Sequence, residues 1–587
     1  MKRLILVFFA TLGGLVFLTL ALLLVLNRAF FSPAALPGEL VLEVNIEDGL
    51  VEAFPQDPFL MTLERRRLRT RDVVEAIDEA ARDDRVLGVL VRGSGGLPGW
   101  GTAEELREAL ERFRGMEKPV AFFAETFGEL SPGQLSYHLA TAADQIYLQP
   151  SGEVGLAPLV LEAPFLRGLL DRFDIEPRFD RRGEYKEASE LFTEREFTPQ
   201  SREAATQLLT SLEASLLEGL VAGRGVSVDR ALELLSAGPY PAREARELGL
   251  VDELLYLDEA RSALHDRVGG SPESVGVESY LERGRRGWDR GPRVALVYGV
   301  GSIHRGRSGY DPLSGSGSLG ASTVAAHLRE AVADPAVEAI LFRVNSPGGS
   351  WVASDQVRRE IRRAREEGIP VVVSMSDVAA SGGYVISMDA DRIVAHPSTF
   401  TGSIGVVAGR FVTREGFESA GIDWDRVQNT EGMNFYSAVD DFSPEGWERF
   451  QEFLDRIYED FVDGVAEGRG MSVEEVDRVA RGRVWSGRDA LELGLVDRLG
   501  GFGTALDQVR ELLELESDAE LDVAVYPEER TLLQVLLEEG RGREWAGTGA
   551  AAEAFALLRP VLRWAAEAGI TEVPGPVRTP LPKVPGR

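Results

Sequence analysis

One stretch of the chain decides the fold: Val337-Glu-Ala-Ile-Leu-Phe-Arg-Val-Asn-Ser-Pro-Gly-Gly349, an apolar run that ends in a glycine turn. A second stretch has the same form, Val86-Leu-Gly-Val-Leu-Val-Arg-Gly-Ser-Gly-Gly96. Short apolar runs bounded by glycine turns are typical of buried strands. Helical patterns lie on both sides of each run, and strands that alternate with helices indicate an α/β fold.

Around these stretches the chain consists of two versions of one unit. Each unit begins with a strand-like run, at residues 40–46 and 293–300. Both later contain the same six residues, Glu247-Leu-Gly-Leu-Val-Asp252 and Glu492-Leu-Gly-Leu-Val-Asp497. Identity at corresponding places in both halves predicts an internal repeat.

These patterns predict four segments. They are a cytoplasmic tip with a transmembrane signal anchor at 1–30, a first repeat at 38–290, a second repeat at 291–510 and a C-terminal extension at 511–587. The extension does not fit the repeat, and residues 571–587 are rich in proline, which favours an extended tail.

The predicted anchor is the uncharged, mainly apolar run at residues 4–26. As a helix it would span roughly 34 Å, enough for the ~30 Å hydrocarbon core of a bilayer. It is longer than the apolar region of a cleaved signal peptide, about 7–15 residues. Because Lys2 and Arg3 precede it, we expect a cytoplasmic amino terminus and a body on the periplasmic, extracytoplasmic side of the cytoplasmic membrane.

The composition excludes several classes of function. The net charge of -31 would repel phosphates, so we expect no nucleic-acid partner. The absence of cysteine rules out disulfides, thiolate metal ligands and cysteine nucleophiles. The five histidines show no zinc-binding spacing, so we expect no metal site.

Lysine is rare in this chain. Four of the 64 basic residues are lysines, and the other sixty are arginines; the lysines are Lys2, Lys118, Lys186 and Lys583. Arginine keeps its proton in proteins, whereas lysine can lose it. A retained lysine is therefore a candidate for chemistry that needs a neutral amine, with chance survival as the alternative.

Three motifs in the second half carry candidate chemistry. Asn345-Ser-Pro-Gly-Gly349 could aim backbone N–H groups at an oxyanion, or be a plain strand-to-helix turn. Ala379-Ala-Ser-Gly-Gly383 places Ser381 at the expected start of a helix, or marks a close helix–sheet contact. Thr401-Gly-Ser-Ile-Gly405 could line the same cleft, or be a turn between two strands.

The repeat serves as an internal control on these motifs. Pairing Tyr137 with Tyr384 places Gln134 opposite Ser381, so the first half lacks the serine. Lys186 lies in the first half, and its counterpart near residues 432–436 contains no lysine. One half thus offers a nucleophile and the other a base, as a single active site shared by two halves would require.

With these residues in view, the chain resembles the long form of the signal peptide peptidase A (protease IV) family, over about residues 1–510. The resemblance implies a ClpP/crotonase-like fold in each half, a homotetramer, no cofactor or metal, and cleavage of leftover signal peptides at the membrane. It implies these roles: Ser381 as nucleophile, Lys186 as base, Gly382 with Gly349 or Gly348 as oxyanion hole, and Ser403 as the partner that orients the lysine.

Two other functions remain open from the sequence. A crotonase-like acyl-CoA enzyme would use the same glycine turn for a thioester, but CoA is cytoplasmic and the body is expected outside. A non-catalytic anchored scaffold is the second alternative, and the presence of both Ser381 and Lys186 disfavours it.

Overall fold

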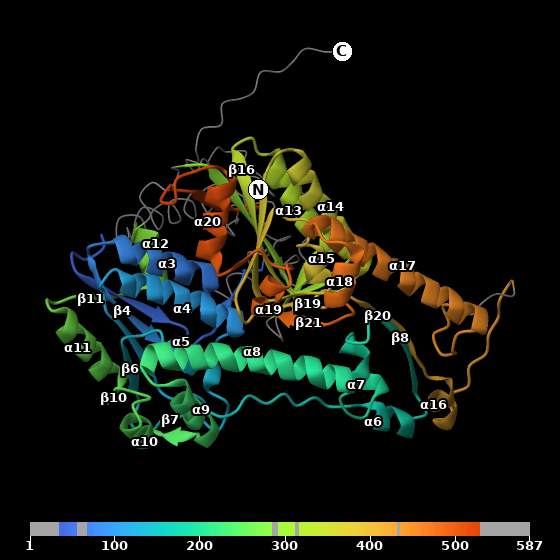
Figure 1. Cartoon of the computed structure of the whole chain (residues 1–587), viewed down its shortest axis with the longest axis horizontal. Helices are drawn as coiled ribbons and strands as arrows, with labels where there is room; N and C mark the ends of the chain where they lie inside the picture. The colour runs from blue at the N-terminus through green and yellow to red at the C-terminus, as the bar shows by residue number, and fades with distance from the viewer. Residues whose placement is uncertain (1–34, 56–66, 285–290, 312–315, 431–434, 529–587) are drawn as a thin grey trace, which may run out of the picture.

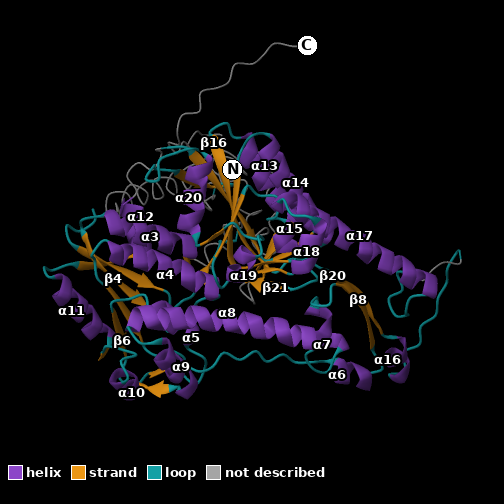
Figure 2. Ribbon diagram, in the orientation of Figure 1, coloured by secondary structure: helices purple, strands orange, loops and turns teal. Residues whose placement is uncertain are grey.

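The computed structural model describes residues 35–55, 67–284, 291–311, 316–430 and 435–528, and these form two parallel sheets covered by helices (Figures 1 and 2). The first sheet has the order β10-β6-β5-β4-β1-β11. Its strands are β1 (Leu40–Asn45), β4 (Val86–Arg92), β5 (Val120–Ala124), β6 (Gln145–Leu148), β10 (Glu253–Leu254) and β11 (Glu273–Gly276).

The second sheet repeats this order as β22-β18-β17-β16-β12-β23, again all parallel. Its strands are β12 (Arg293–Val300), β16 (Val337–Ser346), β17 (Val371–Ala380), β18 (Arg392–Ala395), β22 (Arg498–Leu499) and β23 (Asp522–Val525). The far end of β17 also pairs with β19 (Phe400–Gly402), which pairs in turn with β21 (Val484–Ser486). The predicted α/β class is confirmed.

Helices at equivalent places cover the two sheets. In the first half they are α3 (Thr70–Arg82), α4 (Trp100–Gly115), α5 (Gln134–Ala140), α8 (Pro199–Arg224), α9 (Val228–Ala237), α10 (Ala242–Glu247), α11 (Leu257–Val268) and α12 (Val277–Gly284). In the second half they are α13 (Ala321–Ala333), α14 (Trp351–Glu366), α15 (Gly382–Val385), α17 (Pro444–Arg469), α18 (Val473–Val479), α19 (Gly487–Glu492) and α20 (Phe502–Leu512).

The six residues shared by the two halves have the same structural role in each. Arg224, in the last turn of α8, pairs with Asp252 at 2.9 Å, and Arg469, in the last turn of α17, pairs with Asp497 at 2.6 Å. Each aspartate also accepts a backbone N–H at the start of β6 or β18 (2.7 Å in both). The motif therefore ties the end of a long helix to the end of the sheet.

The second sheet extends beyond its predicted boundary. We expected the repeat to end at residue 510, but β23 pairs with β12 as β11 pairs with β1. The boundary was wrong because Asp522–Val525 is short and half-buried, so its sequence carries little strand signal.

A pair of strands connects the halves away from the two sheets. In Figure 1 the chain leaves the first half below α8 and reaches α6 (Arg167–Arg172) and β8 (Glu176–Arg182) near α16 (Arg414–Ser419). β8 pairs antiparallel along its whole length with β20 (Val406–Val412) of the second half. This pairing brings the segment after β8, which includes Lys186, to the end of β19.

The shorter elements complete the chain. They are β2 (Leu50–Val51), β3 (Leu68–Arg69), β7 (Glu153–Val154), η1 (Glu187–Ser189), α7 (Glu190–Thr193), β9 (Tyr240–Pro241), β13 (Ser302–His304), β14 (Arg307–Asp311) and β15 (Ser316–Gly320). Among the described residues, no helix combines the length and apolarity needed to cross a bilayer. The predicted anchor at 4–26 and the proline-rich tail lie outside the described residues.

Candidate active site

Ser381 lies at the end of the central strand β17, in a sharp turn before α15. Its backbone has φ 55° and ψ -118°, a conformation that costs a non-glycine residue energy. The turn is held because the Ser381 N–H donates to Gly402 O (2.9 Å) and the Ser381 carbonyl accepts from Tyr384 and Val385. The backbone of Ser381 is therefore fixed, and its hydroxyl lies at the carboxyl end of β17.

The position of Tyr384 supports the pairing of the two halves made from sequence. Its hydroxyl donates to Leu495 O (2.9 Å), and the Tyr137 hydroxyl donates to the equivalent Leu250 O (2.7 Å). Gln134 begins α5 where Ser381 precedes α15, and its amide donates to Ala157 O (2.8 Å). The first half therefore has no hydroxyl nucleophile at this place.

Lys186 is brought to Ser381 from the other half of the chain. Its Nζ donates to Ser381 Oγ (3.0 Å), to Ser403 O (2.7 Å) and to Ser403 Oγ (2.9 Å). The residue is 6% exposed. The sequence placed these three residues in separate motifs, and the structure brings all three together.

Burial lowers the pKa of Lys186 to about 7, against the opposing charge of Glu187. Lys186 lies in a turn just before η1, and not in a helix. The other acidic neighbour, Glu184, is turned to Arg481 at 3.1 Å. A substantial fraction of the amine is therefore unprotonated near neutral pH, as a general base requires.

The predicted oxyanion glycines lie against one another. A Cβ built on Gly382 would lie 3.0 Å from Gly349 N, and one on Gly348 would lie 2.6 Å from Gly382 N. Gly348 and Gly349 have φ values of 99° and 153°, so the turn needs glycine at both positions. The Gly348 N–H donates to Ser346 Oγ (3.2 Å), which favours Gly349 over Gly348 as the partner of Gly382.

The described residues offer no other candidate for this chemistry. They contain no cluster of metal-ligating side chains, and none of the hydrogen bonds of the histidines reaches Ser381. His396 is engaged elsewhere, because its Nε2 contacts Glu105 at 3.0 Å. Lys186 is thus the only basic side chain in hydrogen-bond contact with the Ser381 hydroxyl in the described part of the chain.

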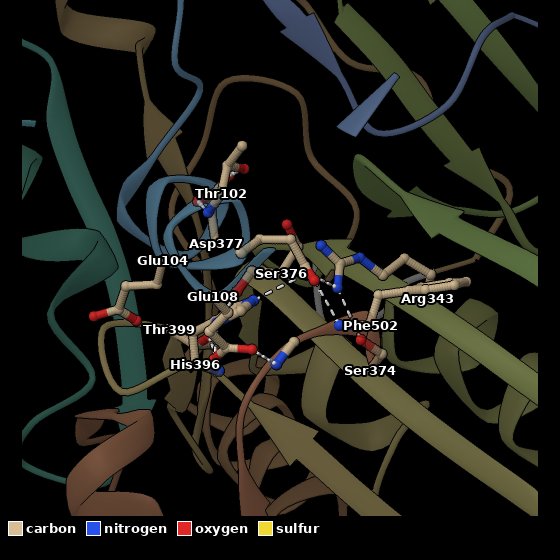
Figure 3. A network of polar contacts seen from close by, with 12 residues as sticks. Thr102, Glu104, Glu108, Arg343, Ser374, Ser376, Asp377, His396, Thr399 and Phe502 are labelled. Carbon is tan, nitrogen blue, oxygen red and sulfur yellow. Dashed lines mark hydrogen bonds and ion pairs between the residues drawn. The ribbon is translucent and has the colours of Figure 1, made fainter. Parts of the chain in front are cut away.

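A buried charge network, which the sequence reasoning missed, joins residues of the two halves (Figure 3). Arg343 of β16 contacts Glu52 at 3.0 Å and Glu105 of α4 at 2.8 Å. It also donates to Ser374 (2.8 Å), and Ser376 donates to Glu52 (2.7 Å). The sequence shows a charged residue, Arg343, inside the apolar run at 339–344, but nothing in it identifies the partners of that residue.

The network fixes the charges of its members. Burial alone would raise the pKa of Glu105, but Arg343 and His396 hold it well below its usual range. Burial opposes the charge of His396, but Glu105 and Glu108 raise its pKa to about 10. Glutamates of the first half thus meet cations of the second half in the interior of the molecule.

The network also reaches β17, the strand that leads to Ser381. Asp377 of β17 accepts the Thr102 N–H (2.8 Å) and hydroxyl (3.0 Å) in the first turn of α4. A Cβ on Gly99 would lie 2.4 Å from Asp377 Cγ, so helix and strand are in close contact. The first half therefore packs directly on β17 only four residues before Ser381.

Comparison with known proteins identifies the family. The model of peptidase family S49 matches residues 112–270 and 363–516. The two matched segments begin near the ends of the equivalent helices α4 and α14. Each half of the chain therefore carries its own family segment.

Curated relatives agree along most of the chain. Protease 4 of Salmonella typhi is 33% identical over 80% of this chain and 76% of its own length. Protease 4 of Haemophilus influenzae is 31% identical over 86% and 85%, and the chloroplastic serine protease SPPA of Arabidopsis thaliana is 31% identical over 73% and 63%.

Among solved structures, a mutant of ClpP1 from Listeria monocytogenes matches 37% of this chain and 95% of its own, with 18% identity and a TM-score of 0.23. That score is too low to identify a shared fold, so the ClpP/crotonase-like form of each half stays a prediction. The relatives favour a peptidase over the acyl-CoA enzyme and the scaffold. The chain belongs to peptidase family S49 and is a serine protease of the protease 4 (signal peptide peptidase A) type.

Proposed function

We propose that Ser381 and Lys186 are the catalytic dyad of this protease. The observation that carries the proposal is the 3.0 Å contact between Lys186 Nζ and Ser381 Oγ, made by an amine whose pKa burial lowers to about 7. The neutral amine takes the hydroxyl proton as Oγ attacks the peptide carbonyl carbon. The resulting ammonium then gives that proton to the leaving amine, and an acyl-enzyme remains. A water molecule, deprotonated by the same lysine, releases the acyl group.

In this mechanism the N–H groups of Gly382 and Gly349 bind the oxyanion. Support comes from the close approach of the two glycines in front of Ser381. Donors fixed before the reaction stabilise developing charge without rearrangement. Ser403 orients the lysine, because its carbonyl and hydroxyl oxygens lie 2.7 and 2.9 Å from Nζ and leave Nζ aimed at Ser381.

We further propose that the substrates are hydrophobic peptides such as the remnants of cleaved signal peptides. A relative from Enterococcus faecium, 35% identical over 31% of this chain, is described as a putative signal peptide peptidase SppA. Residues 4–26 would anchor the protease in the cytoplasmic membrane with its body outside, and the working form would be a homotetramer. Carbonate extraction that released the intact chain would contradict the anchor, and light scattering of the detergent-solubilised protein would test the tetramer.

A fluorophosphonate probe tests the nucleophile directly. Such probes label activated serines, so wild type should be labelled and lose peptidase activity in proportion. Ser381→Ala should be neither labelled nor active on a hydrophobic peptide, with an unchanged melting temperature because the change is small. Ser262→Ala, at an exposed serine of α11, is the control and should behave as wild type. Full activity of Ser381→Ala would exclude the proposed dyad.

A further inference from the structure

The loop between α18 and β21, residues 480–483, contacts the turn that holds Lys186; we call it the bridging loop. The carbonyl of Arg481 accepts the N–H of Tyr185, the residue before the lysine (2.9 Å). The Arg481 side chain pairs with Glu184 at 3.1 Å. The bridging loop thus fixes both the backbone and a side chain of the turn before Lys186.

The other side of the bridging loop holds the segment of Ser403. The Gly482 N–H donates to Ile404 O (2.8 Å), and the Ser403 N–H donates to Arg483 O (2.7 Å). The guanidinium of Arg483 also lies 4.7 Å from the Tyr185 ring centroid. The segments of Lys186 and Ser403 are therefore both hydrogen-bonded to one four-residue loop.

Glycines allow the three segments to approach this closely. A Cβ on Gly482 would lie 2.5 Å from Lys186 N and 2.6 Å from its Cβ. A Cβ on Gly183 would lie 2.1 Å from Arg481 C, and one on Gly405 would lie 2.7 Å from Gly482 Cα. Gly482 is the middle of this stack, and any side chain there would push the lysine backbone away.

We propose that the bridging loop is the positioning element of the dyad, with Gly482 as the residue that sets how deeply the Lys186 amine stands against Ser381 and Ser403. The loop acts by holding Lys186 and Ser403, the residue that contacts the lysine amine. This inference rests on the proposed function, because it assigns the loop a role only if Lys186 is the base.

The charged groups around Lys186 bear on the test. The charge of Glu187 opposes the lowered pKa of the lysine. The neighbouring ion pairs are Arg481–Glu184, Arg481–Asp477, Arg483–Glu203 and Arg181–Glu190. Moving Lys186 outward would hydrate its ammonium and raise its pKa toward the ordinary value.

The experiment compares two glycine-to-alanine variants of the full chain. Gly482→Ala adds a methyl group against Lys186 at a position with φ 81°, whereas Gly249→Ala adds one in open space at φ 75°. Both variants suffer a similar backbone strain, so the difference between them reports the contact with Lys186. The measurement is kcat and KM from about pH 5 to 10, together with the melting temperature.

For Gly482→Ala we expect the rising limb of kcat/KM to move to higher pH by about one unit or more, which lowers the rate below neutrality about tenfold per unit. The change should lie in kcat, with KM nearly unaffected, because the lysine does not bind substrate. Gly249→Ala should keep the wild-type limb. A general loss of stability would lower the rates at every pH by one factor and leave the limb in place.

The inference is overturned if Gly482→Ala and Gly249→Ala share one pH profile. A failure of the proposed dyad gives another result, since Lys186→Ala would then stay active and kcat/KM of wild type would not rise with pH.

If Gly482→Ala does not fold, Arg481→Ala replaces it. It trims a half-exposed side chain, leaves Glu184 unpaired near the lysine, and should move the limb in the same direction by less.

Discussion

Lys186 and Arg343 are both buried basic residues, and their hydrogen-bond partners decide whether each side chain is protonated. Arg343 lies between two carboxylates, which together with its intrinsic basicity keep it protonated. Lys186 has neutral oxygens from two serines as its hydrogen-bond partners, so burial lowers its pKa. A chain that uses arginine for almost every other positive charge thus keeps a lysine where the proposed mechanism needs a proton to be lost.

Substitutions at position 186 distinguish a lysine that acts as a base from one that only supplies positive charge. We expect Lys186→Arg to be as inactive as Lys186→Ala, because guanidinium cannot take a proton from Ser381. Loss of a general base typically costs about 10²–10⁴-fold in rate. The measurement is kcat/KM of both variants, with Arg230→Lys, at an exposed residue of α9, as a control that keeps its charge. An arginine variant within about tenfold of wild type would remove Lys186 as the base.

The lowered pKa of Lys186 also predicts the direction of the pH dependence. The ammonium form predominates below about pH 7 and cannot act as a base, so kcat/KM should rise as pH increases through that value. The same shift affects stability: between about pH 7 and the ordinary lysine pKa the unfolded chain binds more protons, so the free energy of unfolding rises with pH there. Lys186→Met should abolish that part of the slope, and an unchanged slope would contradict the buried neutral amine.

At the scale of elements, β17 has two functions along its ten residues. In its middle, Ser376 contacts Glu52 and Asp377 contacts Thr102, both in the first half of the molecule. Ser374 contacts Arg343, the partner of Glu52. The strand then ends just before Ser381. Nothing in the local sequence revealed these contacts, because Glu52 and Arg343 are far apart in the chain and pair only once both halves are folded. The strand, helix and glycine-turn pattern was visible because it is periodic; the pairing between halves has no such period.

Breaking the network should destabilise the molecule more than breaking a surface pair. We expect Arg343→Met to lower the free energy of unfolding by about 3–5 kcal/mol, because Glu52 would lose its buried cationic partner and Glu105 would keep only His396. Arg363→Met, which breaks an exposed pair with Glu367, should cost about 0–1 kcal/mol. Thermal unfolding of both variants gives the comparison, and equal losses would show that the network is not a major contact between the halves.

At the scale of the whole molecule, one site is assembled from two similar halves. The sequence reasoning predicted this division from the serine and the lysine that each half lacks, and the contact between Lys186 and Ser381 agrees with it. The sequence did not predict which elements bring Lys186 to Ser381. The pairing of β8 with β20 joins segments more than 200 residues apart, and neither strand alone carries a signal for it. The end of the second repeat was missed for a local reason, the shortness of β23.

Because Lys186 and Ser381 contact each other within one chain, the proposed dyad predicts that inactive variants do not rescue each other. We expect an equimolar mixture of Ser381→Ala and Lys186→Ala, co-expressed or refolded together, to stay inactive. A site shared between subunits would instead recover a fraction of wild-type activity. Wild type mixed with Ser381→Ala is the control, and it should keep activity in proportion to the wild-type chains present.

Synthesis of the protein completes the active site in a fixed temporal order. The ribosome makes Lys186 first, and Ser381, the proposed nucleophile, follows 195 residues later. The bridging loop is later still, at residues 480–483, so a nascent chain holds Lys186 long before anything can fix it against a serine. By the inference above, a prematurely terminated product that ends before residue 480 would lack the bridging loop, and its Lys186 would not be held at the depth that lowers its pKa.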